Sequence, residues 1–246
     1  MKKAFDGLSF EMFKRLAKDT SLSDYEKIGF PDSYREGYDN AIFEDILGKL
    51  PRLSENKSSF LDIGPGCSDL PKKIINESLK KNQFVTLIDS TEMLKLLPDN
   101  KSIQKINGFF PDCIDQDNFQ EKYDSILCYS VLHYIYAEEK IEDFVKTCCF
   151  LLNHNGTLLI GDIPNISKRN RFFSSEAGIN FHKSFMNTSD LPDIIDSSSG
   201  ANFIDDDTIK NIIFSFRAKG LDAYVVPQSK FLPMHNRRED IIVYKP

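Results

Sequence analysis

Two short segments of the sequence carry residues of the kind that bind small ligands. Residues 60–70 form an apolar run that includes Asp62, passes through Gly64, Pro65 and Gly66, and ends in residues suited to begin a helix. Glycine lets the backbone approach a ligand closely. Residues 85–90 form a second apolar run that ends in Asp89, whose carboxylate can accept hydrogen bonds from both hydroxyls of a ribose. Together the two segments predict a nucleoside site.

Further candidates for this site follow the second and third apolar runs. Ser90 comes directly after Asp89, and Met93 lies one helical turn further on, where its side chain can pack on a purine. Asn107, Gly108 and Phe109 follow the third run, where a side-chain amide and a backbone N–H can bind the edge of an adenine. An adenosine without phosphates accounts for all of these residues.

Two phosphate-binding alternatives fit the glycine segment less well. A dinucleotide fingerprint needs glycine at the sixth place of G-x-G-x-x-G, but Asp69 stands there, and its carboxylate would repel a pyrophosphate. A P-loop needs Gly-Lys-Ser/Thr, which does not follow the glycines. The sequence therefore disfavours NAD and nucleoside triphosphates as ligands.

The elements that must position these residues alternate between strands and helices, which predicts an α/β fold with a parallel sheet and helices on both faces. The expected strands are residues 59–63, 85–89, 123–129 and 157–161, and a helical stripe of apolar residues runs from Ile141 to Leu152. Near the C-terminal end, Asp207 is expected to cap a helix that stops at Gly220. Two strands, 221–226 and 241–244, follow and are expected to pair antiparallel at the sheet edge.

Two regions lie outside this alternation. Residues 1–50 carry two helical stripes, and we expect them to form an N-terminal helical lid over the cofactor side of the sheet. Residues 51–246 form the main domain. Within it, residues 163–205 are too long and too weakly patterned for an ordinary connection, so they are expected to be a substrate-binding insertion.

Composition narrows the class of protein. The 246 residues are 41% hydrophobic and carry a formal net charge of -6, so the average field repels nucleic acid and anionic membrane. The five cysteines show neither C-x-x-C nor zinc-ligand spacing and are expected to be reduced thiols. Neither a signal peptide nor a membrane-spanning run is visible. The sequence predicts a cytoplasmic protein without nucleic-acid, membrane or metal binding, and it leaves the oligomeric state open.

The order of five motifs resembles the class I S-adenosylmethionine-dependent methyltransferases. These motifs are LDIGPG, LIDSTEML, NGFFPD, YDSILCYSVLHYI and LLNHNGTLLIGD, which together span about residues 60–162. The resemblance implies a Rossmann-like seven-stranded sheet whose last strand is antiparallel. It also implies residues 62–66 around the methionine part of the cofactor, Asp89 on the ribose, residues 107–109 near the adenine, and Tyr129 to His133 beside the transferred methyl group. Ser68 stands where many members of the family carry a third glycine.

Methyl transfer needs the nucleophile, the carbon and the sulfur held in line, and one base suffices for a hydroxyl acceptor. His133 follows the fourth expected strand and is the first candidate base, although a histidine there can equally cap or pack within the turn. His182, inside the insertion, is a second candidate, for which a surface or orienting role is also open. Asp162 ends the next expected strand and could orient either histidine or the acceptor, or cap the exit loop.

Four arginines form two groups on a chain that is otherwise acidic. Arg169 and Arg171 stand near the start of the insertion among aromatic residues, and Arg237 and Arg238 precede the last expected strand. Arginine offers forked donors for phosphate and carboxylate, so these side chains are candidates for binding an anionic acceptor. For each arginine taken alone, an ordinary solvent-exposed side chain on a loop is the simpler interpretation.

The favoured interpretation is O-methylation of a small, anionic acceptor such as a phosphorylated or nucleotide-linked sugar in surface polysaccharide biosynthesis. The sequence lacks the Asn/Asp-Pro-Pro-Tyr motif after the fourth strand, having Cys128-Tyr129-Ser130-Val131 there, which is unlike enzymes that methylate amino groups of DNA. Two alternatives stay open: an N-methyltransferase of a small metabolite, and a non-catalytic subunit that binds S-adenosylmethionine for a partner. The expected product from the cofactor is S-adenosylhomocysteine.

Overall fold

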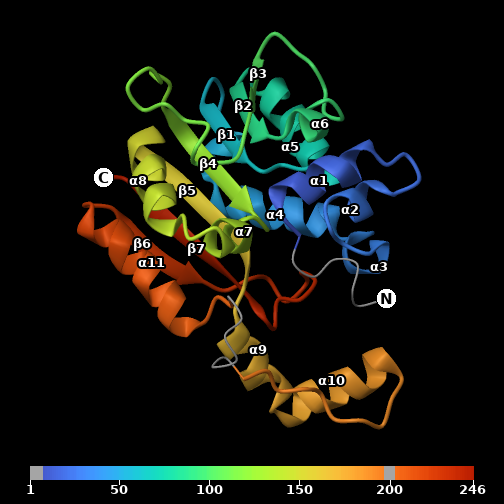
Figure 1. Ribbon diagram of the computed structural model, residues 1–246. Coiled ribbons are helices and arrows are strands. Elements are labelled where there is room, and N and C mark those ends of the chain that lie inside the picture. Colours follow the sequence, from blue (N-terminus) through green and yellow to red (C-terminus); the bar gives the residue numbers. More distant parts are fainter. Residues whose placement is uncertain (1–7, 197–202) are drawn as a thin grey trace.

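The computed structural model describes residues 8–196 and 203–246, which are built around a seven-stranded sheet (Figure 1). The strand order is β3-β2-β1-β4-β5-β7-β6. The strands are β1 (Ser59–Ile63), β2 (Phe84–Asp89), β3 (Ile103–Asn107), β4 (Tyr123–Tyr129), β5 (Leu152–Pro164), β6 (Asp222–Val226) and β7 (Arg238–Tyr244). The first five strands pair in parallel, and β7 runs antiparallel to both β5 and β6. The predicted α/β fold with an antiparallel last strand is therefore confirmed.

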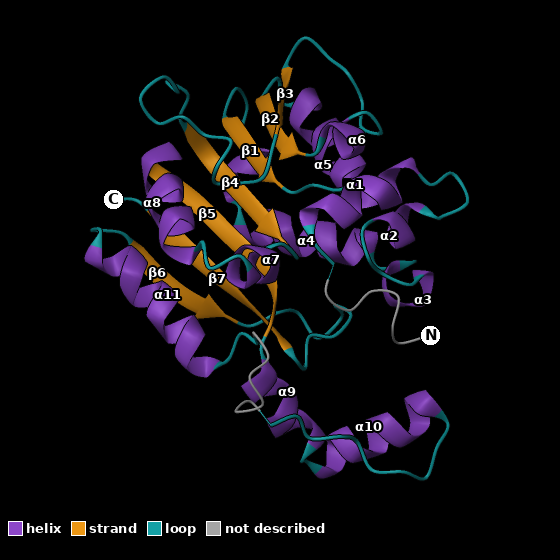
Figure 2. Cartoon of the chain, viewed as in Figure 1, coloured by secondary structure: helices purple, strands orange, loops and turns teal. Residues whose placement is uncertain are grey.

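Helices lie on both faces of the sheet (Figure 2). They are α1 (Phe10–Lys18), α2 (Asp24–Lys27), α3 (Asp32–Arg35), α4 (Asp39–Lys49), the 3-10 helix η1 (Pro51–Ser54), α5 (Asp69–Lys80), α6 (Thr91–Leu94), α7 (Leu132–Ala137), α8 (Ile141–Leu151), α9 (Ile166–Phe173), α10 (Glu176–Met186) and α11 (Asp206–Ala218). In the described stretches, none of these helices combines the length and the apolar character needed to cross a bilayer.

Alternation along the strands divides the core into two layers. Leu61 of β1 and Ile126 of β4 pack with α8 and α11 on one face, whereas Phe60 and Leu127 pack with α4 and α5 on the other. Successive residues of a strand point to opposite faces, so a strand covered on both sides is apolar throughout. This explains why the apolar runs in the sequence are continuous rather than alternating.

One sequence-based boundary is wrong. The side chain of Asp205, rather than that of Asp207, accepts the hydrogen bond from the Thr208 N–H at 2.8 Å and caps α11. An N-cap residue is extended and its side chain accepts the N–H of the second or third helical residue; Asp205 is extended and Thr208 is the third residue after it. Asp207 instead lies in the first turn and pairs with Lys210 on the surface.

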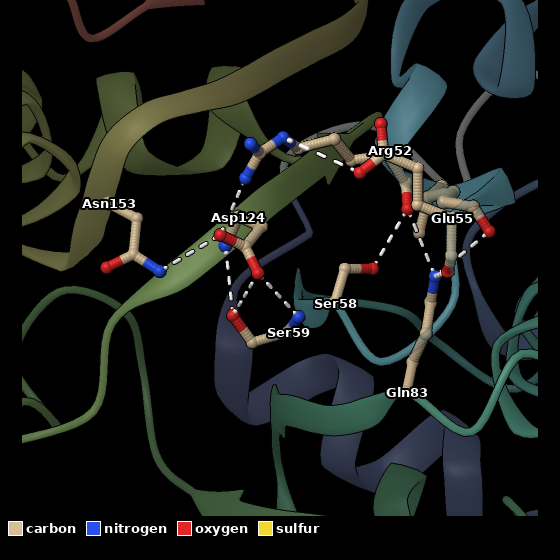
Figure 3. Close-up of polar contacts among 8 residues, drawn as sticks. Arg52, Glu55, Ser58, Ser59, Gln83, Asp124 and Asn153 are labelled. Carbon is tan, nitrogen blue, oxygen red and sulfur yellow. Dashed lines mark hydrogen bonds and ion pairs between the residues drawn. The ribbon is translucent and has the colours of Figure 1, made fainter.

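A polar cluster fixes β1 against β4 at the amino ends of the strands (Figure 3). The carboxylate of Asp124 accepts hydrogen bonds from the Ser59 N–H at 2.9 Å, from Arg52 at 2.8 Å and from Asn153 at 3.1 Å. Burial raises the pKa of Asp124, but these donors outweigh burial, and the net pKa lies below its ordinary value. Gln83 donates to three backbone carbonyls in and beside η1. These contacts fix the pairing register of β1 and β4 at the amino ends of the strands. The glycine turn follows β1 at its other end.

Helices α9 and α10 form an arm that extends away from the sheet (Figure 1). The arm follows β5, which continues through Pro164, so the first two residues of the expected insertion belong to the strand. The N-terminal helices α1 to α4 lie beside the carboxyl ends of β1 and β4, since residues of all these elements line the same cavity. The division into a lid, a main domain and an insertion stays a prediction.

Candidate functional site

A cavity lies at the carboxyl ends of β1, β2 and β4, with an empty volume of about 1130 Å³ that includes its open mouth. Nine of the eleven residues that the sequence suggested for cofactor contact line it: Asp62, Gly64, Pro65, Gly66, Asp89, Met93, Gly108, Phe109 and Tyr129. The carboxyl ends of parallel strands share one edge of a sheet, which brings these distant segments together. A cavity of this size with few polar groups is typical of small-molecule sites.

The turn after β1 requires both of its glycines. Gly64 and Gly66 each have a φ of 67°, in the left-handed region that favours glycine. A Cβ on Gly64 would lie 2.6 Å from a methyl carbon of Val131, and one on Gly66 would lie 2.6 Å from a methyl carbon of Ile28. Both of these partners also line the cavity. The turn is therefore packed against the walls of the cavity without room for side chains.

Two carboxylates stand at the cavity with raised pKa values. Burial raises the pKa of Asp89 to about 6, although N–H donors of Gly66 at 3.1 Å and Ser90 at 2.6 Å oppose the shift. Burial, and then the charge of Asp89, raise the pKa of Asp62 to about 8. Each Asp89 oxygen accepts one backbone N–H, which leaves lone pairs for further donors. A pair of acids with raised pKa values favours a ligand that brings donors or positive charge.

Two of the expected cofactor contacts do not line the cavity. Ser90 is fully buried, and its hydroxyl accepts the Met93 N–H at 3.2 Å to cap α6. The side-chain oxygen of Asn107 accepts the Thr91 N–H at 2.9 Å. Both bonds hold the start of α6 and with it Met93, which lies in the cavity wall. Direct contact of Ser90 and Asn107 with a ligand stays a prediction.

Sequence reasoning missed the contribution of Arg35 from α3. This side chain lines the cavity yet is only 5% exposed, and its guanidinium lies 4.2 Å from the ring centroid of Phe30. Its Nη2 donates to Ser130 at 2.7 Å and to Asp162 at 2.5 Å, whereas its Nε is buried without a hydrogen-bond partner among the described residues. In the sequence, Arg35 is a single arginine in a weakly patterned stretch that contains no motif, so nothing there indicates its role.

Asp162 joins the ends of several elements. It sits at the end of β5 with a φ of 57° and accepts hydrogen bonds from Ser130 and Arg35, and its N–H donates to Asp240 at 2.8 Å. Burial raises the pKa of Asp162, but the charges of Arg238 and Arg35 outweigh burial, and the net pKa is lowered. The ionised Asp162 thus fastens the N-terminal helices to the sheet. The orienting role that the sequence suggested for Asp162 stays a prediction.

The two candidate histidines occupy different places. His133 is half-buried at the start of α7, and its ring centroid lies 4.0 Å from that of Tyr134, which lines the cavity although His133 does not. Its Nδ1 is buried without a partner among the described residues. Burial, and then the nearby Arg238, lower the pKa of His133 to about 3. His182 lies on the arm helix α10, with its ring 6.1 Å from Phe173.

The four arginines separate into two kinds. Arg171 forms an ion pair with Asp206 on the surface. Arg238 donates a hydrogen bond to the backbone carbonyl of Asp162 at 3.0 Å, and its Nη1 lies 3.8 Å from the Asp162 carboxylate. Arg169 and Arg237 both lie near the ring of Phe173, with guanidinium carbons 4.9 Å and 5.9 Å from its centroid. The structure therefore does not gather all four at one point.

Solved structures resemble this chain at low sequence identity, although no protein-family model and no curated protein sequence matches it. The pyocyanin biosynthetic protein PhzM is 14% identical with a TM-score of 0.55, covering 98% of this chain and 63% of PhzM. The N-methyltransferase NodS from Bradyrhizobium japonicum WM9, in complex with S-adenosylhomocysteine, is 12% identical with a TM-score of 0.54, covering 96% and 98%. The plantazolicin methyltransferase BpumL, also in complex with S-adenosylhomocysteine, is 16% identical with a TM-score of 0.53, covering 96% of each chain.

This chain has the class I methyltransferase fold. It spans 63% of the length of PhzM and nearly all of NodS and BpumL. The likeness covers strands and helices well beyond residues 60–162, on which the sequence resemblance rested. At these identities it establishes the fold, and the residues of the cavity carry the argument on function.

Proposed function

We propose that this chain is a methyltransferase that binds S-adenosylmethionine in the cavity at the carboxyl ends of β1, β2 and β4. The observation that carries the proposal is the pairing of the Gly64–Gly66 turn with Asp89, whose carboxylate is fixed by the Gly66 N–H at 3.1 Å and opens to the cavity. A nucleoside fits this arrangement, because a fixed carboxylate can accept both ribose hydroxyls. NodS and BpumL, which share the fold, hold S-adenosylhomocysteine.

The remaining lining residues fit the two ends of this cofactor. Met93 and Phe109 offer apolar surface to the adenine, beside the backbone of Gly108. Asp62, with its raised pKa, would bind the cationic amino group. The unpartnered Nε of Arg35 offers a donor to the carboxylate of the methionine part. S-adenosylmethionine supplies an electrophilic methyl group on a sulfonium.

The protein's own contribution to transfer is to bind, to exclude water and to receive a proton. Phe10, Phe13 and Phe30 of the N-terminal segment line the cavity and would keep water out, which supports the proposed lid role of residues 1–50. His133 stays neutral at pH 7 because of its low pKa, so a ring nitrogen is free to accept a hydroxyl proton. We propose His133 as the base and His182, on the arm, as an acceptor-orienting residue.

For the acceptor we propose a small anionic molecule that is methylated on oxygen, such as a phosphorylated or nucleotide-linked sugar used for surface polysaccharide. Arg169 on the arm and Arg237 directly before β7 support an anionic acceptor, and residues 163–205 are the proposed substrate-binding insertion. We also propose that the protein acts in the cytoplasm, where its five free cysteines would stay reduced.

One observation favours a second candidate, N-methylation of a small metabolite. A histidine whose pKa is about 3 is a weak base, and an amine that is already neutral needs no base to attack a methyl group. NodS, of the same fold, is an N-methyltransferase. The non-catalytic alternative, a subunit that only binds the cofactor, is distinguished by the absence of any turnover.

Transfer of radiolabelled methyl groups tests the proposal. The purified protein is incubated with methyl-labelled S-adenosylmethionine and pools of phosphorylated sugars, neutral sugars and small amines, and label in low-mass products is counted. We expect labelling of phosphorylated sugars, reduced about tenfold by His133→Gln, which is less than the roughly 100-fold of a well-matched general base because the pKa of His133 is low. Labelling of amines that His133→Gln leaves unchanged would favour the second candidate, and bound cofactor without labelling of any pool would favour the binding subunit.

A further inference from the structure

We propose that Arg169 and Arg237 form the subsite that binds the anionic group of the acceptor, and that Arg171 and Arg238 do not take part. The inference rests on the proposed methyltransferase function, and it narrows the four candidate arginines to one pair. The pair joins two segments far apart in the sequence, since Arg169 belongs to α9 of the arm and Arg237 directly precedes β7.

Phe173 holds the two guanidinium groups in place. The Arg169 carbon lies 4.9 Å and the Arg237 carbon 5.9 Å from the centroid of this buried ring. A guanidinium that rests on an aromatic ring keeps its forked donors free at its edge and loses fewer conformations when it binds. Two such forks beside one ring form a preorganised receptor for a planar or tetrahedral anion.

Neither member of the pair has a carboxylate within ion-pair distance among the described residues. Arg169 donates to neutral oxygens, the Asp193 carbonyl at 3.0 Å and the Asn170 side chain at 3.4 Å, and the Asp193 charge acts on it only at longer range. Arg237 donates to the side-chain oxygen of Asn236 at 3.0 Å. Half-buried cations without a carboxylate in ion-pair contact are uncommon in a chain of net charge -6.

The surroundings of Arg237 make the positive charge costly. Burial, then the charge of Arg238 and less strongly that of Arg169, lower the pKa of Arg237, and together they outweigh the opposing effects of Tyr34 and Asp162. Arg171 is neutralised by Asp206, and Arg238 shares the Asp162 carboxylate with Arg35, so each of these two side chains already has a carboxylate within ion-pair distance, which Arg169 and Arg237 lack among the described residues. An anion between Arg169 and Arg237 would offset the repulsion between them. Charge balance therefore selects this pair.

The pair also lies where an acceptor can reach the cavity. Arg238, the next residue along the chain, bonds to Asp162, and Asp162 binds Ser130 and Arg35 in the cavity wall. On the other side, Tyr34 next to Arg35 approaches Phe185 of the arm, with ring centroids 6.3 Å apart. The subsite is thus bounded by the arm, the start of β7 and the N-terminal helices. An acceptor held there by its anionic end would extend its other end toward the cavity.

Calorimetric titration with inorganic phosphate at constant ionic strength tests the subsite without any methyl transfer. We expect the wild-type protein to bind phosphate, Arg169→Gln and Arg237→Gln each to weaken binding about tenfold, and the double variant to abolish it. Lys146→Gln, which removes one exposed positive charge on α8, is the matched control and should bind as the wild type does. Arg237→Lys should lose part of the affinity, because lysine keeps the charge but not the fork.

A second titration, with acetate, distinguishes the two sources of an anionic group. Stronger binding of phosphate supports a phosphorylated acceptor, and stronger binding of acetate supports a carboxylate acceptor. Equal phosphate affinity in the wild type and in a folded double variant, or no phosphate binding at all, would overturn the subsite. Binding of S-adenosylhomocysteine in the same instrument confirms that each variant is folded, and its absence in the wild type would instead count against the proposed function.

Discussion

The protein should become more stable when Asp62 is replaced by asparagine, although the change removes a group of the proposed site. Asp62 is 3% exposed, and its pKa is about 8 in the folded protein against 3.8 as its ordinary value. A raised folded pKa means that Asp62 stays protonated in the folded protein up to about pH 8, whereas it ionises near pH 4 in the unfolded chain, so the group destabilises the fold increasingly between these two pH values. At 1.36 kcal/mol for each pH unit, the cost is about 1.6 kcal/mol at pH 5 and about 5 kcal/mol at pH 8.

Urea unfolding at pH 5 and at pH 8 measures this difference. The gain in the free energy of unfolding from Asp62→Asn should be about 3 to 4 kcal/mol larger at pH 8 than at pH 5. Asp222→Asn, which removes an exposed carboxylate from β6, is the control and should show no such difference. A gain that is the same at both pH values would refute the claim that folding raises the pKa of Asp62.

The same carboxylate should make cofactor binding depend on pH. If the cationic amino group of S-adenosylhomocysteine binds ionised Asp62, affinity should rise from pH 6 to pH 8, by up to about tenfold for each unit. Asp62→Asn should bind more weakly at pH 8 and with a flat pH profile. A buried carboxyl group that destabilises the fold and is retained because a ligand needs it is typical of functional sites. A wild-type profile as flat as that of the variant would show that Asp62 does not titrate on binding.

Three further substitutions test the structure around the site. Gly64→Ala should destabilise the protein by about 1 to 3 kcal/mol and abolish binding of S-adenosylhomocysteine. The reason is that Gly64 has a φ of 67° and an added Cβ would lie 2.6 Å from a methyl carbon of Val131. Thermal unfolding measures the loss of stability, and calorimetry measures the loss of binding. Arg35→Ala should cost about 3 kcal/mol, because the buried Asp162 loses its ion pair at 2.5 Å and keeps only Arg238 at 3.8 Å, and addition of Asp162→Asn should restore part of that stability in urea unfolding. Asp205→Ala should cost about 1 kcal/mol by removing the cap of α11, whereas Asp207→Ala should change stability little, and the reverse order would contradict the assigned cap.

The central part of the fold could be predicted from the sequence because burial there is simple. Residues 59–63 and 123–129 are largely apolar, since their strands are covered on both faces, and the structure places β1 and β4 at those positions. Gly64, Asp89 and Gly108 follow such strands, so their meeting at one sheet edge follows from parallel pairing.

The contributions of the N-terminal segment and the arm could not be predicted in this way. Arg35 reaches the cavity from a four-residue helix, and its partners Ser130 and Asp162 are 95 and 127 residues away in sequence. A contact of that range leaves no periodic signal. Arg169 and Arg237 likewise share one neighbour, the ring of Phe173, only through the tertiary fold, so the sequence could name four arginines but not select two.

Calorimetric titration with S-adenosylmethionine, S-adenosylhomocysteine and NAD tests the central claim most directly, with Asp89→Ala as the comparison. The account predicts micromolar binding of the two sulfur compounds, no binding of NAD, and affinity for S-adenosylhomocysteine weakened about tenfold or more in Asp89→Ala, which loses the acceptor for the ribose hydroxyls. Failure of both sulfur compounds to bind the folded wild-type protein, or equal affinity in wild type and Asp89→Ala, would contradict it.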